Sequence, residues 1–129
     1  MIIRGKVVFI YDIEVFPNLF ILTAKNTESG ARRVFEISDR KNDLPQIYML
    51  FKNKHILYGG FNVIHYDNPL VSFLLIHYDE LIRLPVWEIC KKIKELSDEI
   101  VTSKDGQFSS WSRYKYANLF PTLDLLTML

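Results

Sequence analysis

The sequence has few of the features that mark disulfide-rich or strongly charged proteins. Only one of its 129 residues is a cysteine, Cys90, so an internal disulfide and a cysteine-rich zinc site are excluded. Sixteen basic and fifteen acidic residues leave a net charge of +1, so the chain as a whole has no field that would attract polyanions. Any nucleic-acid site must therefore be local or assisted by a metal ion.

Long apolar runs, internal repeats and low-complexity tracts are missing as well. No signal-peptide pattern opens the sequence, and no apolar run reaches the length that a membrane span requires. Together with the single cysteine, these absences predict a soluble, cytoplasmic protein with no membrane contact. The hydrophobic content of 49% and the aromatic content of 14% predict one globular domain over residues 1–129.

The most informative stretch is the apolar run 9–17, which two acidic residues interrupt. Because side chains of an extended strand alternate between its faces, Asp12 and Glu14 share one face while Tyr11 and Ile13 share the other. Two like charges in an apolar strand oppose each other's ionisation, and a hard cation such as Mg²⁺ or Mn²⁺ would relieve that repulsion. The pair is therefore predicted to belong to a metal site. The alternative is two solvent-facing acids on an edge strand.

The first half of the chain is predicted to form most of a sheet. Hydrophobic alternation predicts strands over 6–13, 19–24 and 33–37, joined as an antiparallel meander. A helix that Asp43 caps and a fourth strand over 56–58 follow. This order of elements predicts an α/β fold.

The second half is predicted to form helices and one more strand. Asn68 is expected to cap a helix whose apolar periodicity continues to Leu81. Asp67 lies just ahead of that helix, where the positive end of the helix dipole would help to keep it ionised. A further helix is predicted over 85–96, and a short strand that leads into a helix over 120–126.

Residues 108–116 interleave aromatic and basic side chains, and the candidates for nucleic-acid contacts are Trp111, Arg113, Tyr114 and Lys115. Aromatic rings stack on unpaired bases while basic groups pair with phosphates, so the pattern is typical of a site for single-stranded nucleic acid. It fits equally well a surface hairpin, after an Asp-Gly turn signal, whose tyrosines pack on the domain.

Two motifs in this order resemble those of the DEDD 3′-to-5′ exonuclease family. Residues 11–14, Tyr-Asp-Ile-Glu, look like its first motif, and residues 61–67, Phe-Asn-Val-Ile-His-Tyr-Asp, look like its second. The likeness is strongest to the proofreading exonuclease domain of phage-type DNA polymerases and covers nearly the whole chain. It implies a ribonuclease H-like mixed sheet, in which three antiparallel strands precede alternating helices and strands.

The resemblance also implies a reaction. Such enzymes hydrolyse phosphodiesters at single-stranded or frayed DNA 3′ ends with two Mg²⁺ or Mn²⁺ ions, about 4 Å apart, that hold the attacking and leaving oxygens. Asp12 would bridge the ions, Glu14 would hold the ion that activates water, and Asp67 would complete the other. The positions expected to contact the terminal nucleotides are Asn62, Phe16 and Tyr66, and Asp124 is a candidate for an additional carboxylate or a strand-end residue that pairs with the backbone.

The family's third motif, a Tyr or His followed three or four residues later by Asp, has no counterpart here. None of the seven tyrosines or three histidines has an Asp at that spacing, and Phe120 and Asp124 have the spacing without a hydroxyl or imidazole. We therefore expect a domain truncated at its C-terminal end, whose partner is the remainder of a DNA polymerase or exonuclease chain. The alternative is a complete protein that has lost the catalytic helix and binds a nucleic acid or protein partner without cutting.

Overall fold

A computed structural model gives the fold and describes residues 1–60, 66–102 and 122–124. Its elements in chain order are β1 (Ile2–Ile3), β2 (Lys6–Phe16), β3 (Leu19–Asn26), β4 (Arg32–Ile37), α1 (Leu44–Phe51), β5 (Ile56–Gly60), α2 (Asp67–Ile76), α3 (Tyr78–Leu81), α4 (Val86–Thr102) and β6 (Thr122–Asp124). The predicted α/β class is confirmed. None of the helices within these residues is long and apolar enough to cross a membrane.

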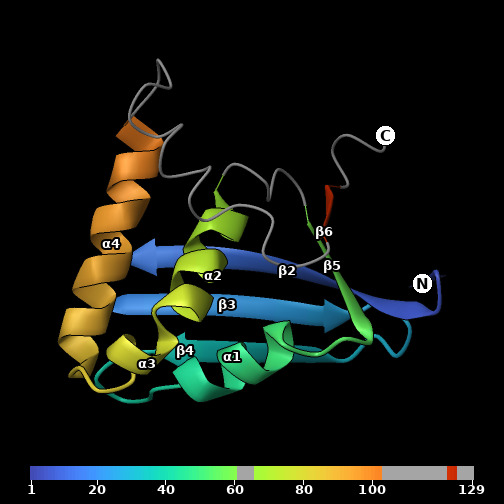
Figure 1. Cartoon of the computed structure of the whole chain (residues 1–129), viewed down its shortest axis with the longest axis horizontal. Helices are drawn as coiled ribbons and strands as arrows, with labels where there is room; N and C mark the ends of the chain where they lie inside the picture. The colour runs from blue at the N-terminus through green and yellow to red at the C-terminus, as the bar shows by residue number, and fades with distance from the viewer. Residues whose placement is uncertain (61–65, 103–121, 125–129) are drawn as a thin grey trace.

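The strands form one mixed sheet with the order β4-β3-β2-β5-β6, and β1 pairs separately with β2 (Figure 1). Strands β2, β3 and β4 are antiparallel, as the alternating pattern predicted. Strand β5 runs parallel to β2 and β6 runs parallel to β5. A parallel pair needs a crossover connection, and α1 lies in the connection between β4 and β5.

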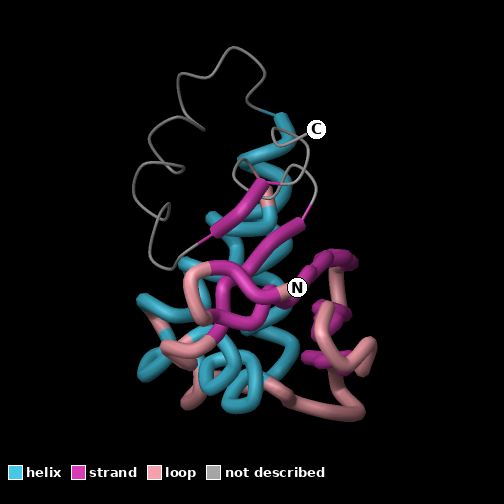
Figure 2. Tube along the Cα trace, turned by 90° about the vertical axis from the view of Figure 1, so that its right-hand side faces the viewer, coloured by secondary structure: helices cyan, strands magenta, loops and turns pink. Residues whose placement is uncertain are grey.

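The helices cover one face of the sheet, as the two views of the chain show (Figure 1, Figure 2). On β2 the side chains of Tyr11 and Ile13 are buried in the core, whereas Asp12 and Glu14 are exposed. The partners of the two buried residues on β3 are also buried apolar side chains. The period-two pattern therefore correctly predicted that the two acids share one strand face and that Tyr11 and Ile13 share the other.

Phe51 on α1 links the helix layer to two tyrosines of the sheet. Its ring meets Tyr11 edge-on at 5.3 Å and stacks on Tyr58 of β5 at 4.5 Å, measured between ring centroids. Both tyrosines are almost fully buried. Aromatic pairs of this kind stabilise a core by about 0.5–1.5 kcal/mol beyond the area that they bury.

Several predicted boundaries are wrong. The strand expected over 6–13 continues to the end of β2, and the last long helix runs on to the end of α4 because Ser97 and Ile100 extend its buried face. The helix expected to continue to Leu81 is broken at His77 into α2 and α3. Apolar periodicity survives such a break because the two short helices bury the same side.

Candidate active site

Asp12 and Glu14 lie in the second half of β2, on the face that the helices leave open. Their partners in the neighbouring strand β3 are Thr23 and Ile21. Both carboxylates are exposed to solvent. Phe16 ends the same strand with 46% of its surface exposed, so all three side chains of this face are accessible to a ligand.

Asp67 lies in the first turn of α2 and is buried, with 7% of its surface exposed. Burial, and after it the charge of Asp12, raise the pKa of Asp67 to about 7. The fold thus brings together two acids from distant parts of the chain. Loss of hydration and a like charge therefore oppose the helix dipole, which was expected to help keep Asp67 ionised.

No hydrogen-bond donor within the described ranges contacts the Asp67 carboxylate. A buried carboxylate without a donor or a counter-ion is costly to ionise, and a divalent cation next to Asp12 and Asp67 would remove that cost. Mg²⁺ commonly binds through only one or two carboxylates, with waters and substrate phosphates as the other ligands. The two acids therefore fit a magnesium or manganese ion.

Over the part of the chain that the structure describes, no three Asp, Glu, His or Cys side chains gather to form a metal-binding group. Glu14 shares its face with Asp12 but does not form such a group with Asp12 and Asp67. Of the three predicted metal ligands, Asp12 lies near enough to Asp67 for its charge to raise the pKa of Asp67, and Glu14 shares the open strand face with Asp12.

Tyr66 immediately precedes Asp67 and occupies the cap position of α2, without a side-chain cap. Its hydroxyl lies 2.6 Å from the Ser97 hydroxyl of α4. Burial is the main cause that raises the pKa of Tyr66, so its hydroxyl stays protonated. Tyr66, which was predicted to contact nucleotides, therefore also links α2 to α4.

Asn68, Tyr11 and Thr122 are the polar residues near the site that the sequence did not identify. Asn68 was expected to cap α2; instead it lies inside the first turn, 3% exposed, and its side chain points to other elements. The Tyr11 hydroxyl donates to Asn68 Oδ1, and Asn68 Nδ2 donates to Thr122 Oγ1 at 3.0 Å. The sequence offered one indication of these polar contacts, which is that Asn68 lies on an otherwise apolar helix face.

The structure describes only some of the other predicted site residues. Asp124 ends β6, and its backbone pairs with Gly60 of β5. Outside the described residues lie Asn62, Trp111, Arg113, Tyr114 and Lys115.

Comparisons with known proteins do not assign a family. No family model, no curated protein and no solved structure matches the chain. The functional argument therefore depends on the residues and on their geometry.

Proposed function

We propose that the chain is a metal-dependent 3′-to-5′ exonuclease domain of the DEDD type, or the amino-terminal part of one, that hydrolyses phosphodiesters at single-stranded or frayed DNA ends. The observation that carries the proposal is the pairing of Asp12 with the buried Asp67. One acid of the first motif, Asp12, thus acts through its charge on the acid of the second motif, Asp67.

The topology supports the proposal and its finer fold class, a ribonuclease H-like domain. Three antiparallel strands are followed by two strands parallel to the first, in the order β4-β3-β2-β5-β6. Asp12 lies toward the carboxyl end of β2, Asp67 follows the carboxyl end of β5, and Asp124 ends β6. Ligands of open α/β sheets bind at the carboxyl ends of the parallel strands, which is where these acids are.

Each residue has a separable role in the proposed reaction. Asp12 and Asp67 would hold the cation, and Glu14 on the same strand face as Asp12 would contribute once a substrate phosphate and waters complete the ligand set. The chemistry that such an ion would supply there is neutralisation of charge on the scissile phosphate and activation of a water. The exposed ring of Phe16 offers a surface on which an unpaired terminal base can stack.

A second candidate function is a catalytically inactive exonuclease-like module that binds a nucleic acid or a protein partner. The observation that favours it is that the described residues include no three-ligand metal group. The sequence also has no third motif to orient the attacking water. In this case Asp12→Asn would leave partner binding intact.

A cleavage assay separates the two candidates. The purified chain is incubated with 5′-labelled single-stranded DNA and Mg²⁺ or Mn²⁺, beside Asp12→Ala, Asp67→Asn and the matched control Asp98→Asn, which changes an exposed acid on α4. We expect stepwise shortening from the 3′ end by the wild type and the control only. No shortening by the wild type with either ion would contradict an active exonuclease and favour the inactive module.

A further inference from the structure

Three of the candidate acids, Asp12, Asp67 and Asp124, each have a nearby residue in the sequence that belongs to one buried polar network. Tyr11 precedes Asp12, Asn68 follows Asp67, and Thr122 lies two residues before the acid that ends β6. We call Tyr11, Asn68 and Thr122 the Asn68 network, and its three members come from β2, α2 and β6.

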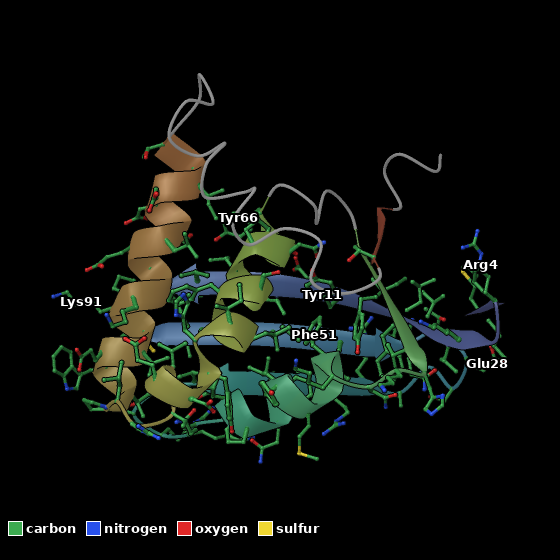
Figure 3. The ribbon with its side chains drawn as sticks, viewed as in Figure 1. Arg4, Tyr11, Glu28, Phe51, Tyr66 and Lys91 are labelled. Carbon is green, nitrogen blue, oxygen red and sulfur yellow. The ribbon has the colours of Figure 1, made fainter. Side chains whose placement is uncertain are left out.

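The Asn68 network lies on the helix-covered side of the sheet, behind the site. Figure 3 shows the side chain of Tyr11 on β2 next to that of Phe51 on α1. Burial, and after it the charge of Asp67, raise the pKa of Tyr11 well above its ordinary value, so the hydroxyl keeps its proton and donates it to Asn68. The Asn68 amide uses its oxygen toward β2 and its nitrogen toward β6, so one side chain joins three elements.

A hydrogen-bond network of this kind is directional, so it can select one relative position of the elements that apolar packing alone would leave less defined. Apolar side chains could fill the same space, and a buried amide is costly unless its hydrogen bonds are made. When they are made, in a low-dielectric interior, they favour one arrangement of the elements that they join. Strand β6 has only three residues, and besides its pairing with β5 the hydrogen bond from Asn68 to Thr122 helps to fix its position.

We propose that Asn68 is a positioning residue, which with Tyr11 and Thr122 fixes the three acid-bearing segments relative to one another before a cation or DNA binds. The proposal rests on the proposed function, because the segments are the ones assigned to the metal site. Groups that orient metal ligands from behind commonly change metal affinity 10- to 100-fold when they are removed.

The chain offers a matched pair of variants for the test. Tyr11→Phe removes the hydroxyl that binds Asn68 and keeps the ring contact with Phe51. Tyr58→Phe is the control, because Tyr58 is equally buried, also packs on Phe51 and donates its hydroxyl to the Leu50 carbonyl, away from the acids.

A second pair of variants concerns the other end of the network. Thr122→Val removes the hydroxyl that accepts from Asn68 and preserves the shape of the side chain. Thr122→Ser preserves the hydroxyl and is the rescue variant.

Two readouts keep structure and metal binding apart. Hydrogen–deuterium exchange of residues 122–124 and of the first turn of α2 is measured without metal, and Mn²⁺ affinity is measured by calorimetry. We expect Tyr11→Phe and Thr122→Val to speed exchange at both segments, and to weaken Mn²⁺ binding about tenfold. Tyr58→Phe and Thr122→Ser should leave both readouts at the wild-type level, although Tyr58→Phe also lowers overall stability.

The outcomes distinguish this inference from the proposed function. If the wild type binds Mn²⁺ but Tyr11→Phe and Thr122→Val behave like their controls, the positioning role is overturned and the proposed metal site stands. If the wild type binds no Mn²⁺, the proposed function is overturned. Exchange then still decides whether the Asn68 network orders the two segments, since that comparison is made without metal.

Discussion

Two buried aspartates at the starts of two helices make an instructive comparison. Asp43 precedes α1 and Asp67 lies in the first turn of α2, and each is 7% exposed. Asp43 accepts a hydrogen bond from the Glu36 backbone N–H at 2.9 Å and lies 3.2 Å from the Lys41 ammonium. Asp67 has no donor within the described part of the chain, and the charge that acts on it is the like charge of Asp12.

The difference shows that this fold can satisfy a buried carboxylate when it uses one for structure. Asp43 links β4 to the start of α1, and its Oδ2 has both a hydrogen-bond donor and a cationic partner. For Asp67 the described residues show no such partner, and burial and the charge of Asp12 make its ionisation costly. A buried acid with a strongly perturbed pKa beside a second acid is typical of a functional site.

The largest expected difference between the two aspartates is in cleavage. Asp67→Asn should lower the rate of DNA shortening by at least about a hundredfold, because a bound ion contributes several kcal/mol to the transition state. Asp43→Asn should cut at the wild-type rate at a temperature well below its unfolding transition. The assay is the shortening of 5′-labelled DNA. An equal loss of cleavage rate in Asp67→Asn and Asp43→Asn would contradict the assignment of Asp67, but not Asp43, to the active site.

The next effect is on the pH dependence of stability. Folded Asp67 keeps its proton up to a pH of about 7, whereas the unfolded chain releases it near the ordinary value of 3.8, so the folded state binds more protons between these values. The free energy of unfolding should therefore fall by an amount on the order of 4 kcal/mol as pH rises from about 4 to about 7, and stay low above it.

Asp67→Asn should abolish this slope and be more stable than the wild type at about pH 8, where the wild-type carboxylate is charged. Urea unfolding at several pH values measures the difference. A variant that is less stable than the wild type throughout would indicate that the Asp67 carboxylate is satisfied after all.

A smaller effect of the opposite sign is expected at the first aspartate. Asp43→Ala removes the acceptor of the Glu36 N–H and should lower the free energy of unfolding by about 1–3 kcal/mol. Its Mn²⁺ affinity, measured by calorimetry, should equal that of the wild type. Weakened metal binding in this variant would mean that the β4–α1 turn contributes to the site.

The smallest effect is stabilisation by Mg²⁺. At a free concentration ten times its dissociation constant, the ion should raise the free energy of unfolding by about 1.4 kcal/mol. The wild type and Asp43→Ala should both gain this stability, whereas Asp67→Asn should gain none. Thermal unfolding with and without Mg²⁺ measures the gain, and equal shifts in all three proteins would point to binding elsewhere.

The local pattern of the sequence was enough for the sheet and for the face on which the acidic pair lies. Alternation alone predicted that Asp12 and Glu14 share one strand face, opposite to Tyr11 and Ile13, because a strand has a fixed period of two residues. The class of the fold followed from the order of the strands and helices. Element ends were less certain, since the break at His77 leaves the apolar period unchanged.

What the sequence could not predict depends on partners that are distant in the chain. Asp43 was correctly placed at the start of a helix, but its carboxylate bonds to β4 rather than to its own helix. Asn68 was taken for a cap because its links to Tyr11 and Thr122 exist only in the folded chain. The raised pKa of Asp67 likewise arises from burial and from Asp12, neither of which a linear pattern contains.

The most direct test of the account is the titration of the Asp67 side-chain carboxyl carbon by NMR, with and without Mg²⁺. We expect a pKa of about 7 without the ion and a large fall in that pKa when Mg²⁺ is added, because the cation replaces the repulsion from Asp12 with attraction. A pKa near the ordinary value of 3.8, or a raised pKa that Mg²⁺ leaves unchanged, would contradict the proposal that this pair of acids binds a catalytic metal ion.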